Sequence, residues 1–108
     1  MTPEKAEAEA QAKLEEYRQM IDEVDRRIVA LLNERTTVVE NIGRVKREAQ
    51  LPVYEPKRED QVFANITSAN CGPLTTQAVR GIFERIIDAS RSIQRLRMMQ
   101  KPPEEPKC

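Results

Sequence analysis

The 108-residue sequence contains no histidine and no tryptophan, and aromatic residues make up only 4% of it. Histidine is the commonest general acid or base near neutral pH, so an enzyme built from this chain is expected to catalyse a reaction that needs little proton transfer. The two cysteines, Cys71 and Cys108, form no paired motif. A metal site is therefore not expected, and no disulfide framework can be recognised.

The chain also lacks an excess of either charge and lacks long apolar runs. Lysine plus arginine and aspartate plus glutamate both number 18, so the net charge is zero and no global positive field is available to hold nucleic acid or an anionic membrane. No apolar run approaches the roughly 20 residues that span a bilayer. The segment 1–13 is rich in Glu and Ala, unlike a signal peptide. We therefore expect a single cytoplasmic domain, in which any recognition of anions must come from locally placed positive groups.

A long seam runs through the first half of the chain, with alternating gaps of three and four residues. This is the a/d pattern of a helix that buries one stripe against partner helices. Its positions are Leu14, Tyr17, Ile21, Val24, Ile28, Leu31, Arg35, Val38, Ile42 and Val45. Burying the guanidinium of Arg35 without a partner is very costly, because Arg does not lose its proton. The sequence therefore predicts an anion beside Arg35, either an acidic side chain of the protein or an anionic ligand.

Three helices account for nearly all of the predicted domain, residues 14–99, so the predicted fold is all-α. The first is expected from Leu14 to Ala49, because Pro52 disfavours helix in the residue before it. The second is expected from Pro56 to Ala69, with proline in its first turn. The sequence Asn-Cys-Gly-Pro then predicts a loop. A third helix, capped by Thr75 or Thr76, is expected to follow and to continue to about Met99.

The first predicted helix is too long for a compact monomer. At about 1.5 Å per residue it would extend roughly 50 Å, whereas a chain of this size has a radius of gyration of about 13 Å. It would overhang its own domain with its apolar stripe exposed, and an interlocked homodimer would cover both stripes. Gly43 is expected to mark a close helix crossing. Residues 1–13 are expected to form a flexible or helical extension, and residues 100–108 a disordered tail.

Polar residues interrupt the apolar faces at several other positions. Lys46 projects from nearly the same face as Arg35, whereas Arg18 lies about 100° around the helix and would reach that face only from a second subunit. Glu55, Arg58 and Glu59 lead into the apolar face of the second helix, and Ser90 and Gln94 interrupt that of the third. Each residue alone is compatible with a surface charge, a structural ion pair or the edge of a helix face. Together they predict a pocket for a small, multiply charged anion.

These residues fall in stretches that resemble the all-helical chorismate mutases, the AroQ class. The resemblance covers roughly Leu14 to Met99 and includes the LLxER, GxxK and P-V-x-[DE]-x-x-RE patterns in order. The matching stretches are Leu14–Arg18, Ile21–Asp25, Leu31–Arg35, Ile42–Lys46, Pro52–Glu59 and Ile86–Ser90 with Gln94. The resemblance implies three helices per chain in an intertwined homodimer. It also implies conversion of chorismate to prephenate, a Claisen rearrangement on the route to Phe and Tyr, without cofactor or metal.

The resemblance also implies a role for each candidate residue at the substrate. Arg35 holds one carboxylate of the substrate, and Arg18 of the other subunit holds the second. Lys46 and Gln94 donate to the ether oxygen, where negative charge develops as the C–O bond breaks, and Arg58 lies near the ring carboxylate and the enolpyruvyl end. Such catalysis is electrostatic preorganisation combined with conformational restraint.

Three candidates remain. Glu59 is implied to accept a hydrogen bond from the ring hydroxyl, helped by a backbone group near Glu55, and Ser90 is implied to line the carboxylate pocket. Gln94 donates at any pH, so we expect no acid optimum. Two alternatives stay open: an isochorismate–pyruvate lyase of the same fold, and a non-catalytic helical dimerisation or adaptor module in which Arg35 pairs with an internal Glu. The tail after Met99 is a candidate docking segment for another enzyme of the pathway.

Overall fold

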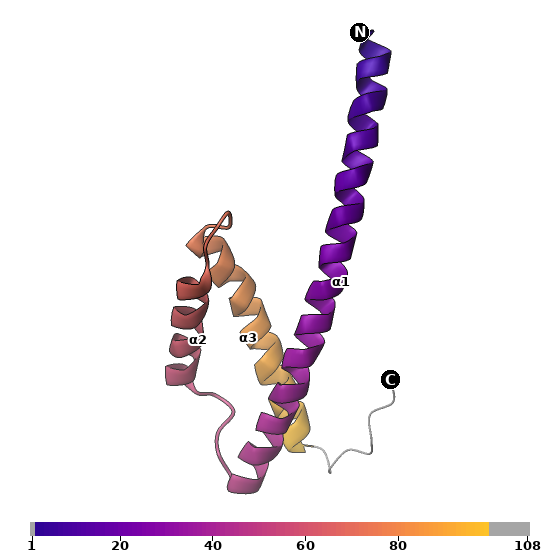
Figure 1. Cartoon of the computed structure of the whole chain (residues 1–108). Coiled ribbons are helices and arrows are strands. Elements are labelled where there is room, and N and C mark those ends of the chain that lie inside the picture. The colour runs from indigo at the N-terminus through magenta and orange to yellow at the C-terminus, as the bar shows by residue number, and fades with distance from the viewer. Residues whose placement is uncertain (1, 100–108) are drawn as a thin grey trace. The chain divides into compact units, whose positions relative to one another are not determined.

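The computed structural model describes residues 2–99. Within this range the chain forms three helices and no strand: α1 (Pro3–Ala49), α2 (Pro56–Ala69) and α3 (Thr76–Met99) (Figure 1). The prediction of an all-α fold with one very long helix is confirmed. The expected disorder of residues 100–108, with Cys108, concerns residues outside the described range.

Helix α1 begins at Pro3, earlier than the expected Leu14, so the N-terminal extension, expected to be either flexible or helical, is helical from that residue. Proline suits the first turn of a helix, and the following residues are mostly Ala, Glu, Lys and Gln, which are strong helix formers. Thr2 caps this end, because its Oγ1 accepts a hydrogen bond from the backbone N–H of Lys5 at 3.2 Å. Helix propensity and a cap therefore extend α1 beyond its apolar seam.

The chain divides into two compact units, the first ending at Arg35 and the second beginning at Thr36. The first unit contributes a single stretch of α1. Its seam side chains are exposed in the single chain, Tyr17 and Leu31 each by 63%. Among the described residues, no helix is both long and apolar enough to cross a membrane.

A reversal of the backbone connects α1 to α2 in the second unit. Gln50 adopts a left-handed conformation with φ 56°, and the N–H of Leu51 donates to the carbonyl of Lys46 at 2.8 Å while that of Gln50 donates to Arg47 at 3.3 Å. This pair of bonds is the Schellman motif that ends many helices. It turns the chain back so that the segment after Leu51 passes the last turn of α1.

Helices α2 and α3 pack against each other and are joined by the loop at residues 70–75 (Figure 1). The side chain of Asn70 shapes this loop by accepting from the N–H of Gly72 at 3.0 Å and donating to the carbonyl of Leu74 at 2.8 Å. Thr75 caps α3, since its Oγ1 accepts from the N–H of Ala78 at 3.1 Å, as one of the two predicted caps. The loop thus fixes where α3 begins.

The buried interior of the second unit is as polar as it is apolar. Val39, Val79 and Ile87 are the buried apolar side chains among the described residues, and Lys46, Ser90 and Gln94 are buried beside them with exposures of 6–8%. Buried polar groups are costly unless they are hydrogen-bonded. Within residues 2–99 every buried side-chain nitrogen and oxygen has a partner. The polar interior is therefore a fully satisfied network.

Gly43 marks a close approach of α1 and α3, as predicted. A Cβ added at Gly43 would lie 3.2 Å from Cβ of Arg97 and 3.4 Å from Cα of Gln94. An ion pair between Glu40 and Arg97 joins the same two helices. The absence of a side chain at Gly43 therefore sets how closely Gln94 approaches the last turns of α1.

A comparison of two glycine substitutions tests this close approach. Gly81 lies in α3 with nothing within 4 Å of an added Cβ, so Gly81→Ala should stabilise the protein by about 1 kcal/mol through helix propensity. Gly43→Ala gains the same propensity but overpacks the crossing, which typically costs about 1–3 kcal/mol. We expect urea unfolding to show the Gly43 variant less stable than the Gly81 variant by this cost. Equal stabilities would contradict a tight crossing.

Candidate functional site

The ammonium of Lys46 is the centre of a buried polar cluster in the second unit. Its Nζ donates to Oε1 of Gln94 at 2.7 Å and to the carbonyl of Val53 at 3.0 Å, and it pairs with Oε1 of Glu55 at 2.6 Å. We call these four residues the Lys46 cluster. An ammonium has three donors, so the three acceptors use them all.

Each member of the Lys46 cluster comes from a different structural element. Lys46 lies in the last turn of α1, Val53 in the connection, Glu55 at the N-cap of α2 and Gln94 in α3. Glu55 makes no side-chain capping bond to α2, and its carboxylate binds Lys46 instead. The backbone reversal after α1 and the close crossing at Gly43 are what bring these elements together.

The orientation of the Gln94 amide follows from its partner. An ammonium can only donate, so the Gln94 atom that faces Lys46 must be the oxygen. The donor of the amide, Nε2, therefore points away from the ammonium. Lys46 thus fixes which way Gln94 presents its N–H groups.

A second charged pair lies one turn further along α2. Glu59 accepts from Arg91 through both oxygens, with Nε–Oε2 and Nη2–Oε1 distances of 2.8 Å. The hydrogen bond from Arg91 lowers the pKa of Glu59, against the effect of burial, and the charges of Arg91 and Lys46 lower it further. Glu59 is therefore a fixed carboxylate that stays ionised to a lower pH than an ordinary Glu.

Ser90 lies on α3 one turn before Gln94. Its hydroxyl donates to the carbonyl of Ile86 at 2.9 Å, a bond that serine commonly makes within helices. Ser90 and Gln94 are both buried and are four residues apart, so they share a face of α3. The structure therefore places a buried hydroxyl on the face of α3 that carries Gln94, and its expected role in lining the carboxylate pocket stays a prediction.

Three predicted cations are not part of the Lys46 cluster. Arg58 is exposed, and its Nη1 donates to Oε1 of Gln61 at 3.4 Å. Arg18 is exposed and Arg35 is half-buried, and both belong to the first unit. The roles expected for these three arginines stay predictions.

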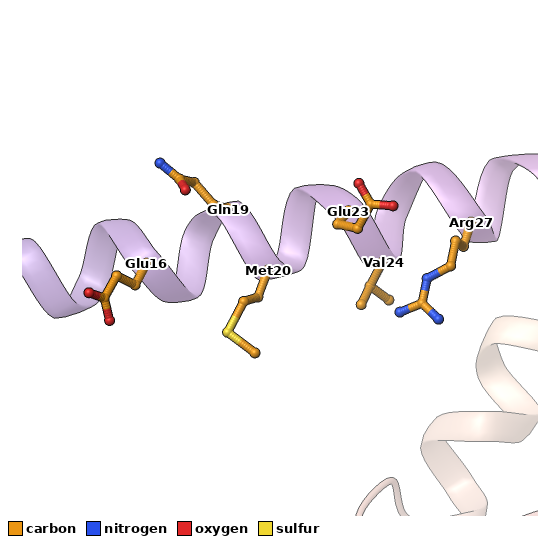
Figure 2. A pocket seen from close by; sticks show the side chains of 6 residues that line it. All are labelled: Glu16, Gln19, Met20, Glu23, Val24 and Arg27. Atoms are coloured by element: carbon orange, nitrogen blue, oxygen red, sulfur yellow. The ribbon is translucent and has the colours of Figure 1, made fainter.

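The first unit also carries a hollow along one side of α1, shown in Figure 2. It is lined by Glu16, Gln19, Met20, Glu23, Val24 and Arg27. All six side chains come from successive turns of one helix, and none of them is a predicted site residue. Because a single helix cannot enclose a ligand, we do not regard this hollow as a candidate site.

Sequence reasoning missed two features of the second unit. Arg91 was not singled out, although it fixes both oxygens of Glu59. A backbone group near Glu55 was expected to contribute to the site, and the pairing of the Glu55 carboxylate with Lys46 was not foreseen. The sequence carries no signal for the pair of Arg91 and Glu59, because these two residues are 32 residues apart. Within residues 2–99 no group of three His, Cys, Asp or Glu side chains could hold a metal ion.

The fold and the site define a class of small all-helical proteins in which a lysine, a glutamine and two ordered carboxylates gather between three helices. The family model for chorismate mutase type II matches residues 17–95. This chain belongs to that family.

Individual relatives agree with the family assignment. A bifunctional chorismate mutase/prephenate dehydratase of Aquifex aeolicus is 36% identical over 87 residues, which are 77% of this chain and 24% of that protein. A chorismate mutase of Methanocaldococcus jannaschii is 28% identical over 85 residues, which are 77% of this chain and 85% of that protein. The solved chorismate mutase of Thermus thermophilus, form II, superposes with a TM-score of 0.75 at 37% identity, covering 77% of this chain and 94% of that one. The chain thus spans about a quarter of the length of the bifunctional relative.

Proposed function

We propose that this chain is a chorismate mutase that converts chorismate to prephenate by a cofactor-free Claisen rearrangement. The observation that carries the proposal is the buried contact of 2.7 Å between Nζ of Lys46 and Oε1 of Gln94. This contact supports the proposal because it joins Lys46 and Gln94, the two residues that the family resemblance assigns as donors to the ether oxygen. Membership of the family supports the same activity.

The rearrangement breaks one C–O bond and forms one C–C bond within the same molecule, so no proton has to move. Negative charge develops on the ether oxygen in the transition state. A cation and an amide donor fixed in advance at that oxygen stabilise the charge without reorganisation during the reaction. This demand fits a chain without histidine.

Substrate must exchange with an existing partner of Lys46, because its three donors are already used. Glu55 is the more exposed of the two side-chain partners, because its side chain is 48% exposed whereas Gln94 is buried. We propose that Glu55 turns toward solvent when the ether oxygen arrives. Gln94 keeps its oxygen on Lys46 and donates through Nε2, so the two donors act on the same oxygen from different sides.

The carboxylates of the substrate are proposed to bind Arg35 and the Arg18 of a second subunit, with Arg58 near the ring carboxylate and Ser90 lining the pocket. The exposed seam supports a homodimer, since an apolar stripe of this length is typical of a covered interface. Its exposed members are Leu14, Tyr17, Ile21, Val24, Ile28, Leu31, Val38, Ile42 and Val45. A partner enzyme of the pathway and a cytoplasmic location stay predictions.

Assays with two substrates test the proposal against its rivals. Pure protein is incubated with chorismate or with isochorismate, and substrate loss and pyruvate release are followed. We expect loss of chorismate without pyruvate. Pyruvate released from isochorismate faster than chorismate is lost would favour a lyase, and no acceleration of either reaction would favour a non-catalytic helical module.

The pH dependence of kcat gives a second test. The amide of Gln94 does not titrate, and the lowered pKa of Glu59 keeps that carboxylate ionised in weak acid. We therefore expect kcat to be nearly constant between about pH 5 and 8, where a catalytic acid or base of ordinary pKa would change its charge. A steep loss of kcat within that range would contradict the roles given to Gln94 and Glu59.

A further inference from the structure

The guanidinium of Arg91 is held from several sides. Besides the two bonds to Glu59, its Nη1 donates to Oδ1 of Asp88 at 3.2 Å, and its Cζ lies 5.7 Å from the centre of the Tyr54 ring. The side chains of Arg91 and Glu59 retain exposures of 30% and 19%. Arg91 is therefore an ordered cation at the edge of the polar interior.

The Glu59–Arg91 pair lies beside the Lys46 cluster on both helices. Glu59 follows Glu55 by one turn of α2, and Arg91 precedes Gln94 by about one turn of α3. The charge of Lys46 reaches Glu59, since it contributes to lowering the pKa of that carboxylate. A movement of the Glu59 carboxylate would therefore change the electrostatic field where the substrate is proposed to bind.

We infer that Arg91 is a positioning residue, which fixes the Glu59 carboxylate so that it accepts a hydrogen bond from the ring hydroxyl of the substrate. The inference rests on the proposed function. A carboxylate has about four lone-pair sites, and a bidentate arginine occupies one on each oxygen. The remaining sites keep a fixed direction, which a freely rotating carboxylate would not offer.

The groups around Glu59 predict what happens when Arg91 is removed. Arg91, itself bonded to Asp88 and stacked beside Tyr54, is the strongest cause of the lowered pKa, burial acts in the opposite direction, and Lys46 is the remaining cation. Without Arg91 the pKa of Glu59 should rise. The carboxylate would then lose its charge as the pH falls, and the hydrogen bond that it accepts from the hydroxyl would weaken.

The experiment compares the full chain with Arg91→Gln, Arg91→Lys and, as a matched control, Arg95→Gln, which changes an exposed arginine of the same helix. The ratio kcat/KM for chorismate is measured from pH 4.5 to 8, with thermal unfolding alongside. We expect Arg91→Gln to lower kcat/KM by about tenfold or more at pH 7.5, as small displacements in a site can, and to add a further fall toward low pH. Wild type and Arg95→Gln should stay nearly flat.

Arg91→Lys keeps the charge but cannot make the bidentate bond, so it should lose activity at all pH values without gaining the fall in acid. If Arg91→Gln does not fold, the kcat/KM of Arg91→Lys provides the test. A merely structural brace would change the unfolding temperature and leave the pH profile unaltered. That result, or a change below about twofold, would overturn the inference.

A double variant separates action through Glu59 from any other role of Arg91. If Arg91 acts by positioning Glu59, Arg91→Gln should reduce kcat/KM little further in a Glu59→Gln background, because coupled residues are not additive. Equal losses in both backgrounds would overturn the inference. A wild-type chain that does not accelerate chorismate loss overturns the proposed function, and the inference with it. An active wild type with an unaffected Arg91→Gln variant overturns the inference alone.

Discussion

Replacing Lys46 with alanine is expected to lower kcat for chorismate by a factor of about 10²–10³, which is the usual effect of removing one donor at a developing negative charge. The effect should fall on kcat more than on KM, because the ether oxygen gains its charge only in the transition state. Gln94→Ala should act in the same direction. Steady-state kinetics with chorismate measure both.

The control for Lys46→Ala must separate chemistry from folding, since Lys46 is buried and holds three acceptors. Lys57 provides a matched variant, because it is an exposed lysine of α2 without a proposed role. Lys57→Ala should keep wild-type kcat, and circular dichroism should show that Lys46→Ala stays helical. A folded Lys46→Ala protein with near wild-type kcat would refute the proposed role of the ammonium.

Mixing two inactive variants is expected to restore activity. If Arg18 acts across the dimer interface, a mixed dimer of Arg18→Ala and Lys46→Ala subunits contains one site with both Lys46 and the partner's Arg18. With equal amounts and random pairing in a twofold dimer, about a quarter of the wild-type activity should return. The mixture is refolded together and its rate of chorismate loss is compared with those of the two separate variants.

The control for this complementation is a mixture of Lys46→Ala with Gln94→Ala. Both residues belong to the same cluster of one chain, so each site formed by such a mixed dimer lacks one donor. This mixture should stay inactive. Inactivity of the Arg18→Ala and Lys46→Ala mixture, with mixed dimers demonstrated by mass spectrometry, would contradict the role of Arg18 across the interface.

The helices could be predicted well because proline and apolar spacing act locally. Pro52 lies just after the end of α1, and Pro56 is the first residue of α2. The Asn-Cys-Gly-Pro loop separates α2 from α3. The structure of the N-terminal extension was left open between helical and flexible for a physical reason, and α1 in fact begins at Pro3. Residues 3–13 carry no apolar stripe, so hydrophobic periodicity does not predict a helix there. Helix propensity and the Thr2 cap stabilise the helix instead.

The candidate site could be predicted only in part, because its contacts depend on how the helices meet. Lys46, Ser90 and Gln94 interrupt apolar faces in the sequence, and the structure buries all three. The pairing of Glu55 with Lys46 depends on the left-handed Gln50 that reverses the chain after α1. That conformation could not be foreseen, since glycine and asparagine are the residues typical of it.

Arg91 shows a second limit of sequence reasoning. Charged residues on helices are usually exposed surface groups, so an arginine beside Ser90 gives no signal by itself. Its partner Glu59 is 32 residues away in the sequence. Only the packing of α2 against α3 reveals that the two form a bidentate pair.

Turnover of chorismate by the purified full chain, with no cofactor added, tests the central claim most directly. Absorbance follows the loss of chorismate, and nuclear magnetic resonance identifies the product. We predict prephenate in amounts equal to the chorismate consumed, formed about 10⁶-fold or more faster than in buffer, as is typical of enzymes. Loss of chorismate no faster than in buffer, from a folded dimeric protein, would contradict the assignment of the Lys46 cluster to catalysis.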